Sequence, residues 1–361
     1  MRFPIPPLLI IMKSLKDFNI NNKRVLVRSD FNVPLDDKQN ILDDFRLRES
    51  LLTIKYLIEN RAKIILMSHL DPESTGLVNP IFKLDKVAEK LSEYLGFAIA
   101  KADDCIGPAL EGQSNNLEAG QILLLENLRF HKEESRPEGY PDLEFAKKLS
   151  YLGDIYVNDS FSVCHRAHAS IVGLPEYLPS CIGLLLEKEL NNLNKILKSS
   201  ERPMIAIVGG KKVETKAKFI DKISQIADCV IISGLLKKEV QDKKIVFLHP
   251  EKILGPDDSL DALDIDQKTI DLFCEKILQA KTILWNGPFG KFEDEKYAKG
   301  TLSLAQAIIE SKAFSVVGGG ETVEFLKKQG MIEKFSHVST GGGAMMAYLA
   351  GDKLPGLEAL K

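Results

Sequence analysis

The sequence predicts an α/β protein with two domains, each built around a parallel β-sheet flanked by helices. Its 361 residues exceed what one hydrophobic core usually organises. Short apolar runs alternate with longer segments in which apolar residues recur every three or four positions. The short runs are continuously apolar, which is typical of parallel strands covered on both faces.

The apolar runs predict strands, and the segments between them predict helices. Leu47, Leu51, Ile54 and Ile58, for example, lie four, three and four positions apart, as on one face of a helix. The predicted strands are 25–27, 64–67, 122–125, 155–157, 205–208, 230–232, 283–285, 314–317 and 337–339.

A helix over 183–199 is predicted to join the two domains. Four leucines form one narrow apolar face, the other positions are mostly Glu, Lys and Asn, and Pro203 follows the end. An ordinary surface helix would show the same pattern. The different chemistry on either side favours a connecting helix. The leucines are Leu186, Leu190, Leu193 and Leu197.

The composition excludes several classes of protein. A chain with 44% hydrophobic and 27% charged residues is not disordered, and a net charge of −3 provides no general attraction for nucleic acid or an anionic membrane. The apolar run 7–12 is far shorter than the roughly 20 residues that span a bilayer.

Since Met12 resembles a second start, we expect residues 1–11 to be a tail or a start-site artefact. The five cysteines are odd in number and lack a CxxC pair, which favours reduced thiols and a cytoplasmic protein.

In the first half, charged and polar residues follow the predicted strands. Ligands of open α/β sheets bind beyond the carboxyl ends of the strands, and Arg46 adds a cation where a helix begins. Arginines and histidines in an acidic protein predict a pocket for a small phosphorylated or carboxylated ligand. The residues are Asp30, Asn32, His69, Asn127, Arg129, Asn158, Asp159, His165, Arg166 and His168. A metal site at His165 and His168 is the alternative, but no carboxylate or cysteine has suitable spacing.

In the second half, glycine turns follow the strands. Such a turn before a helix presents backbone N–H groups to a phosphate. Lys212 and Lys216 lie four positions apart, so they share a helix face and can reach one polyphosphate. The pattern predicts a nucleotide site. The turns are Gly209–Gly210, Asn286–Gly287, Gly318–Gly320 and Thr340–Gly343.

Familiar nucleotide motifs are absent from the sequence. It has neither a GxxxxGK[ST] P-loop nor a GxGxxG fingerprint, and Asp30-Phe31-Asn32 lacks the other protein-kinase motifs. An anion pocket, a nucleotide site and a helix between them predict a kinase for a small substrate, whose domains close to exclude water.

The longest motifs resemble those of the phosphoglycerate kinase family. They occur in the family's order from about Met12 to the C-terminus. The matching stretches are RVLVRSDFNVP (24–34), MSHL (67–70), ENLRFH (126–131), VND (157–159), HRAHAS (165–170), WNGP (285–288) and SHVSTGGG (336–343).

The resemblance implies two Rossmann-like domains joined by a long hinge helix. The phosphoglycerate-binding domain would comprise 12–182 and 346–361, the hinge 183–202 and the nucleotide-binding domain 203–345. The implied reaction transfers a phosphoryl group between 1,3-bisphosphoglycerate and ADP, giving 3-phosphoglycerate and ATP. The implied enzyme is a monomer that uses Mg²⁺ with ATP or ADP.

The resemblance also implies the site residues. Arg46 and Lys212 would act on the transferring phosphoryl group, and Glu321 stands where the family has its Mg²⁺-associated aspartate. The substrate residues would be Asp30, Asn32, Arg46, His69, Arg129 and Arg166. The nucleotide residues would be Gly210, Lys212, Lys216, Asn286, Glu293, Gly318, Gly319, Gly320, Glu321, Thr322, Thr340 and Gly341.

Two stretches depart from the family pattern. Asp71-Pro72-Glu73 replaces the family's Gly-Arg-Pro, which removes a substrate-binding arginine. The segment from Ser233 to about Asp266 is compressed. Two alternatives to an active enzyme therefore stay open: a catalytically weak homologue that binds nucleotide or acts as a scaffold, and a kinase for another small carboxylate.

Overall fold

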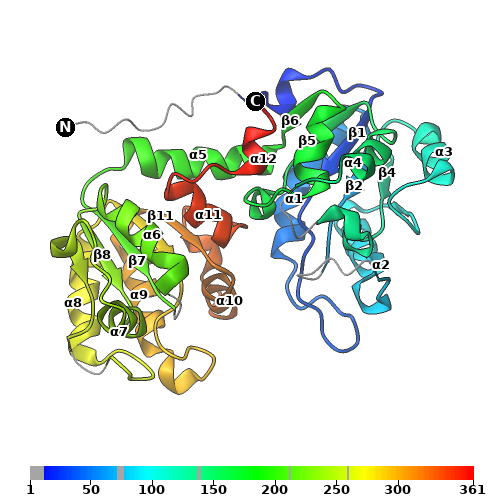
Figure 1. The fold of residues 1–361 in the computed structure, drawn as a ribbon. Helices are drawn as coiled ribbons and strands as arrows, with labels where there is room; N and C mark the ends of the chain where they lie inside the picture. The colour runs from blue at the N-terminus through cyan, green and yellow to red at the C-terminus, as the bar shows by residue number, and fades with distance from the viewer. Residues whose placement is uncertain (1–11, 71–76, 136–139, 211–212, 258–259) are drawn as a thin grey trace. The chain divides into compact units, whose positions relative to one another are not determined.

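The computed structural model describes residues 12–70, 77–135, 140–210, 213–257 and 260–361, and its internal contacts divide the chain into two compact units (Figure 1). The first unit runs to Glu189 and includes Lys353–Lys361, and the second is Leu190–Asp352. The division falls within α5 (Leu184–Ser199). The domain boundaries expected from the sequence remain a prediction, separate from this division by contacts.

The first unit contains a six-stranded parallel sheet in the order β3-β4-β2-β1-β5-β6. The central strand β1 pairs with β2, where Val25 lies opposite Ile64, and with β5, where Val25 lies opposite Ile155. The strands are β1 (Arg24–Arg28), β2 (Lys63–Met67), β3 (Ala100–Lys101), β4 (Ile122–Leu124), β5 (Ile155–Asn158) and β6 (Ser180–Ile182).

Both faces of this sheet are buried. On one face, Val25 and Ile64 pack with Leu47 and Ile54 of α1 and with Leu91 of α2. On the other face, the Tyr156 hydroxyl donates to the Ser170 carbonyl oxygen at 2.8 Å. The α-helices of the first unit are α1 (Phe45–Glu59), α2 (Asp85–Leu95), α3 (Pro108–Asn116), α4 (Leu143–Ser150), the first part of α5 and α12 (Pro355–Glu358). Its shorter helical turns are η1 (Leu15–Asp17), η2 (Pro80–Phe82), η3 (Leu128–Phe130), η4 (Lys132–Glu134), η5 (Phe161–Val163), η6 (Ala169–Gly173) and η7 (Leu174–Glu176).

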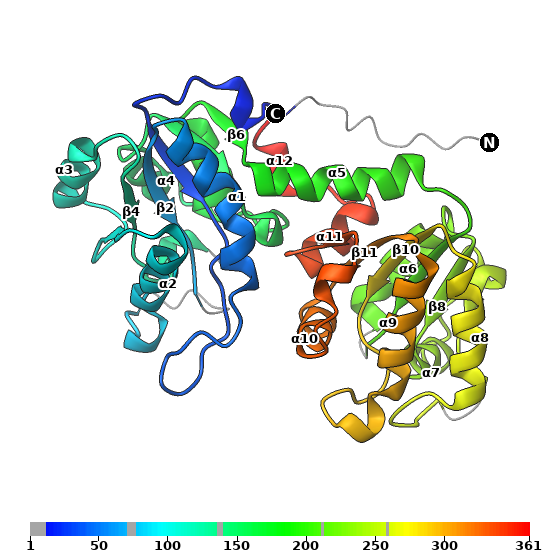
Figure 2. The ribbon, with the colours of Figure 1, turned by 180° about the vertical axis from the view of Figure 1, so that it is seen from behind.

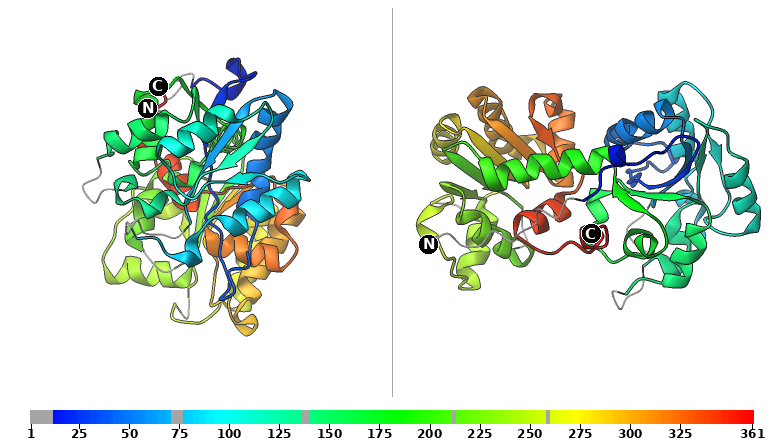
Figure 3. Two further views of the ribbon diagram at one scale, coloured as in Figure 1. Left: turned by 90° about the vertical axis from the view of Figure 1, so that its right-hand side faces the viewer. Right: turned by 90° about the horizontal axis from the view of Figure 1, so that it is seen from above.

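The second unit repeats this architecture with a parallel sheet in the order β12-β11-β10-β7-β8-β9. Helices lie on both sides of each sheet (Figure 3). The strands of the second unit are β7 (Met204–Val208), β8 (Cys229–Ile232), β9 (Ile253–Leu254), β10 (Thr282–Asn286), β11 (Phe314–Gly318) and β12 (His337–Val338).

The core of the second unit includes residues of α8 (Gln267–Leu278) and α9 (Lys299–Ser311), which lie side by side (Figure 2). Phe273 of α8 and Leu304 of α9 pack with Trp285 of β10. The remaining helices are α6 (Val213–Ser224), α7 (Gly234–Asp242), α10 (Gly320–Lys328) and α11 (Gly342–Leu349), with short turns η8 (Pro250–Lys252), η9 (Glu295–Tyr297) and η10 (Ile332–Lys334).

The predicted fold class is confirmed, because both sheets are parallel and flanked by helices. Each of the nine predicted strands is present, within two residues of its predicted ends. The prediction missed β3, β6 and β9, which have two or three residues each and occupy sheet edges. The helix predicted over 183–199 is α5, whereas its role as a hinge stays a prediction. In the described part of the chain, no helix is both long and apolar enough to cross a membrane.

The first turn of α5 is attached to the first unit by the buried carboxylate of Asp159. Its Oδ1 accepts the backbone N–H groups of Leu185 at 3.0 Å and Leu186 at 3.1 Å. A Cβ at Gly183 would lie 2.1 Å from this oxygen, so only glycine allows the close approach. Burial raises the pKa of Asp159 to about 7, although these hydrogen bonds oppose the shift.

The free energy of unfolding of the Asp159→Asn variant should increase relative to that of the native chain as pH rises. Since the folded pKa of Asp159 lies above its ordinary value of 3.8, the folded protein keeps a proton that the unfolded chain loses between about pH 4 and 7. Stability from this group is therefore complete below pH 4 and falls as pH rises to 7. Asparagine does not titrate, so the difference in free energy of unfolding should shift toward the variant by up to about 1.4 kcal/mol per pH unit.

Urea unfolding between pH 4.5 and 7.5 measures this difference. Asp154→Asn is the control, because the pKa of the Arg24-paired Asp154 is lowered and its titration lies below this range. A difference for Asp159→Asn that stays constant with pH would contradict the prediction.

Candidate functional site

The carboxyl ends of β4, β2, β1 and β5 lie next to one another, because these strands are parallel neighbours. The residues that follow them therefore gather at one edge of the first sheet. Asp30 and Asn32 follow β1, and His69 follows β2. Asn32 also lines a hollow of about 520 Å³ with Leu70 and Phe82.

Arg46 joins this edge from the first turn of α1. Its Nη1 donates to the Asn32 carbonyl oxygen at 2.8 Å and lies 3.3 Å from Asp30 Oδ2. Asp30 is buried and also accepts the Ser162 hydroxyl and the Asn32 N–H. The structure thus brings three of the predicted substrate residues into direct contact and fixes the guanidinium of Arg46.

A buried cluster around Arg28 supports the same edge. Arg28 ends β1 with no exposed surface, and its Nε donates to Ser170 Oγ at 2.8 Å. Its Nη2 lies 3.6 Å from Oε1 of Glu134, which is also fully buried. Glu134 in turn accepts the Ser170 hydroxyl at 2.6 Å and the Ser170 N–H at 3.0 Å.

Sequence reasoning missed Arg28, Glu134 and Ser170 as parts of the site. The available signal was the position of Arg28, a charged residue at the end of a strand that is otherwise apolar and buried. Nothing in the local pattern around Glu134 indicates that its carboxylate would face that arginine.

The cluster fixes the tautomer of His69. Arg28 Nη2 lies 3.3 Å from His69 Nδ1, and a guanidinium can only donate, so Nδ1 accepts and the proton lies on Nε2. Burial, then the charges of Arg28 and Arg129, hold the pKa of His69 well below its usual range. At neutral pH, His69 is therefore an uncharged Nε2–H donor.

Arg129 is buried in η3, a turn that begins directly after Asn127. Asn127 Oδ1 accepts the Arg129 N–H at 3.0 Å, while its Nδ2 donates to the carbonyl oxygens of Leu70 and Phe82. Asn127 therefore has a structural role and positions the arginine.

The edge has a strongly positive potential. Burial and then Arg28, Arg129 and the exposed Arg166 lower the pKa of His168 to about 3. Such a field favours a bound anion. His165 and His168 belong to no group with metal-ligand geometry in the described part of the chain, so the anion-binding interpretation is the better one.

In the second unit, the turns after β7 and β10 touch through their backbones. The Gly209 N–H donates to the Asn286 carbonyl oxygen at 2.9 Å, and the Gly210 N–H donates to that of Pro288 at 3.1 Å. A Cβ at Gly209 would lie 2.1 Å from the Pro288 oxygen, so a side chain there would separate the turns. The ammonium of Lys216 donates to the Gly209 oxygen. Burial lowers the pKa of Lys216, and Glu321 opposes this shift.

The turns after β11 and β12 lie beside the turn that follows β10. Gly319 has a φ of +97°, and a Cβ there would lie 3.3 Å from Asn286 Nδ2. A Cβ at Gly342 would lie 2.7 Å from the Gly319 Cα. The Thr322 hydroxyl accepts the Gly287 N–H at 2.9 Å. The predicted glycine turns are thus neighbours at one sheet edge.

One buried polar group at this edge has no partner among the described residues. Asn286 is 3% exposed, and its Nδ2 donates to no partner among the described residues. Thr340 and Gly341 are buried immediately before α11, whereas Gly318 and Gly320 flank Gly319.

The exposed carboxylate of Glu321 lies in the first turn of α10. Mg²⁺ prefers one or two carboxylates together with phosphate oxygens, so the donor chemistry fits a nucleotide-bound Mg²⁺.

Three predicted features remain outside this geometry. Lys212 and the stretch Asp71–Glu73 lie outside the described residues. Glu293 is exposed between β10 and η9, and its assignment depends on the family resemblance alone.

Two parallel-sheet units, one with a cationic strand edge and one with converging glycine turns, are typical of a kinase that acts on a small anionic substrate. The family model for phosphoglycerate kinase matches residues 15–245 and 237–352. The chain therefore belongs to the phosphoglycerate kinase family.

Individual relatives agree with this assignment. The phosphoglycerate kinase of Finegoldia magna is 40% identical over 396 residues, covering 96% of this chain and 98% of that protein. That of Dictyoglomus turgidum is 42% identical over 393 residues, with the same coverage. The crystal structure of phosphoglycerate kinase from Pyrococcus horikoshii OT3 gives a TM-score of 0.85 at 32% identity, covering 97% of this chain and 98% of that one.

The comparisons also locate a difference from the family. The family model matches in two parts that overlap over residues 237–245, within the segment noted above as compressed. The alignment to the Finegoldia magna protein is longer than the 361 residues of this chain, so that protein contains residues with no counterpart here.

Glu134→Gln should destabilise the first unit by about 3–5 kcal/mol, because removing one partner leaves the charge of Arg28 buried without compensation. Chemical denaturation measures the loss. Glu144→Gln is the control, since Glu144 is an exposed residue of α4. Equal stability of the two variants would contradict the importance of the buried pair.

Proposed function

We propose that this protein catalyses reversible phosphoryl transfer between 1,3-bisphosphoglycerate and ADP, giving 3-phosphoglycerate and ATP, as a step of glycolysis that also runs in reverse. The observation that carries the proposal is the cationic edge of the first sheet, in a chain that belongs to this family over nearly its whole length.

The first unit supplies the phosphoglycerate half-site in this proposal. Arg46, Arg129 and Arg166 would pair with the phosphate and carboxylate groups, since guanidinium matches both geometrically. His69 would donate its Nε2 proton, and Asp30 and Asn32 would orient the substrate and hold Arg46.

The second unit supplies the nucleotide half-site. Backbone N–H groups of the turns around Gly210, Gly318–Gly320 and Gly341 would bind phosphate oxygens, together with Lys216 and the Nδ2 of Asn286. Thr322 holds one turn in place, and Glu293 and Thr340 complete the proposed nucleotide contacts. Glu321 would hold Mg²⁺, which supplies charge neutralisation to the nucleotide phosphates.

The proposed chemistry needs positioning and charge rather than a general base. In the ATP-consuming direction the attacking group is the carboxylate of 3-phosphoglycerate, which is already ionised at neutral pH. Arg46, Lys212 and Lys216 would stabilise negative charge on the phosphoryl group as it passes in line between the two oxygens.

The other interpretations gain no support from these observations. A purely nucleotide-binding or scaffold protein has no use for the fixed Arg46 and the tautomer of His69. Both are present, which favours the catalytic proposal over a scaffold protein.

Arg46→Ala should lower kcat/KM for 3-phosphoglycerate by about ten- to a hundredfold, because one charge-assisted contact contributes about 1.5–3 kcal/mol. The KM for Mg·ATP should change little. A coupled assay with purified protein, 3-phosphoglycerate and Mg·ATP measures both values.

Lys216→Ala should lower kcat in the same assay, with Lys212→Ala measured beside it. Arg48→Ala and Lys218→Ala are the matched controls, since both are exposed residues of the same helices, α1 and α6. An inactive native protein, or site variants as active as the controls, would overturn the proposed function.

Phosphoryl transfer requires both half-sites to act on one phosphoryl group. We propose that bending around α5 serves this requirement, and that the enzyme works as a cytoplasmic monomer. All five cysteines lie in the described part of the chain as free thiols, which supports a reducing compartment.

Small-angle scattering should show a smaller radius of gyration with 3-phosphoglycerate and an ATP analogue bound together than with either alone. The same data report the molecular mass and so test the monomer. An unchanged radius with both ligands would contradict the proposed bending.

A further inference from the structure

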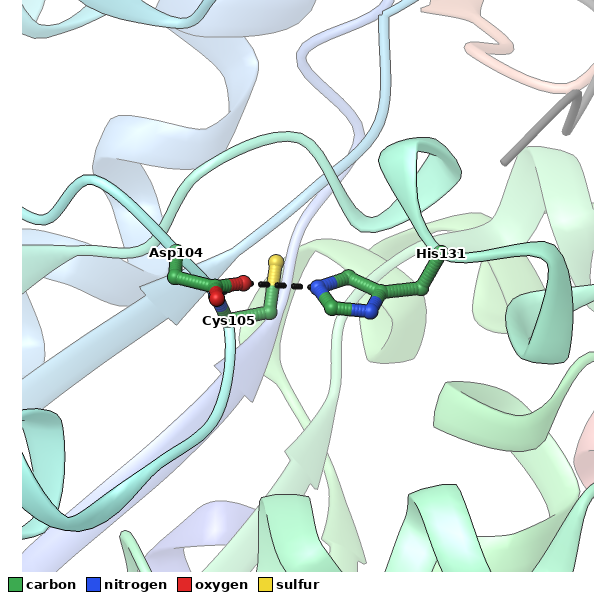
Figure 4. Close-up of side chains that lie close together, drawn as sticks. All are labelled: Asp104, Cys105 and His131. Carbon is green, nitrogen blue, oxygen red and sulfur yellow. Dashed lines mark hydrogen bonds and ion pairs between the residues drawn. The ribbon is translucent and has the colours of Figure 1, made fainter. Parts of the chain in front are cut away.

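Asp104, Cys105 and His131 form a compact group in the first unit (Figure 4). One ligand atom from each residue lies within 4.8 Å of the other two. His131 Nε2 lies 2.7 Å from Asp104 Oδ1, and Figure 4 shows the Cys105 sulfur beside this pair. None of the three residues has a role in the phosphoryl-transfer site described above.

We propose that these three side chains form a binding site for Zn²⁺ or a similar borderline-soft divalent ion. A thiolate, an imidazole nitrogen and a carboxylate oxygen are the donors that zinc prefers, and three protein ligands leave one position for water. Hard ions such as Mg²⁺ select oxygen donors instead, so this site would differ from the nucleotide site in the metal it takes.

The geometry needs only a small adjustment to hold the ion. Zinc bonds of about 2.0–2.3 Å in a tetrahedral arrangement place ligand atoms roughly 3.3–3.8 Å apart. The side chain of Asp104 is 60% exposed and can turn, whereas Cys105 is fully buried. The open coordination position would face solvent on the side of Asp104.

The neighbouring structure holds His131 in place, and one backbone N–H orients Asp104 beside Cys105. The His131 ring packs on Phe145 with a centroid separation of 4.9 Å, and the His131 N–H donates to the Leu128 carbonyl oxygen. Asp104 Oδ1 also accepts the Cys105 N–H at 2.7 Å. Such preorganisation reduces the entropy that binding would otherwise cost.

The surroundings of the sulfur favour a cation. Burial and then the charges of Asp104, Glu126 and Glu134 raise the pKa of the Cys105 thiol, and Lys101 opposes them. The negative potential that disfavours an isolated thiolate would attract a divalent ion.

Binding would release one proton. Without metal, the Cys105 thiol donates to the Glu126 carbonyl oxygen at 3.0 Å, and His131 Nε2 donates to a carboxylate that can only accept. On binding, the thiol proton leaves to solvent and the imidazole proton moves from Nε2 to Nδ1. The ion then gains a thiolate and a neutral imidazole nitrogen.

Cobalt titration of the full chain tests the site. Protein freed of metal by chelation, without nucleotide, should bind one Co²⁺ per chain with a near-ultraviolet thiolate-to-cobalt absorption band, and Zn²⁺ should displace it. Cys105→Ser and His131→Asn should abolish the band and weaken Zn²⁺ binding by at least about tenfold, because even supporting residues contribute that much. Cys229→Ser, which changes a half-buried thiol outside the group, is the matched control.

Two results would overturn the proposal: no thiolate band in the native protein, or a band that survives in both Cys105→Ser and His131→Asn. Either would make the group a hydrogen-bonded cluster only. Circular dichroism checks that the variants fold, and the exposed Asp104→Asn gives a further variant in which Zn²⁺ affinity should fall. Metal binding is measured without kinase substrates, so this result is independent of the proposed function.

Discussion

The parallel pairing of every strand is the constraint on which the rest of the structure depends. In each sheet, all strands end at the same edge, so residues far apart in the sequence meet there. Arg46, which follows β1 at the start of α1, contacts Asp30, while Gly209 after β7 contacts Pro288 after β10. One topology thus produces two kinds of edge. The first gathers guanidinium groups, and the second gathers glycine turns that approach too closely for side chains.

The buried cluster shows how the cationic edge is maintained. Four arginines around two histidines would repel one another, and burial followed by the charges of these arginines lowers the pKa values of His69 and His168. Glu134 compensates the most deeply buried arginine, and Ser170 fixes the carboxylate. Asp30 pairs in the same way with Arg46. Two of the four arginines are thus ion-paired within the protein, which lets like charges gather at one edge of the sheet.

The sequence predicted the architecture well because its central strands are continuous apolar runs. The run at 205–208, for example, became β7 at the centre of the second sheet. The missed strands β3 and β9 have two residues each, too few for any periodicity, and their pairing partners alone define them. Site residues at strand ends, such as Asp30 and His69, were also predictable. Arg28, Glu134 and Ser170 were not, because their contacts join residues that are more than a hundred positions apart or have no shared pattern.

The attachment of α5 has a mechanical consequence. The backbone N–H groups of its first turn donate to Thr53 and Asp159, two side chains that belong to different elements of the first unit. These hydrogen bonds fix the first turn of α5 against the first unit. The residues of α5 up to Leu186 are therefore anchored to the first unit, and a bend in the helix would have to begin after them.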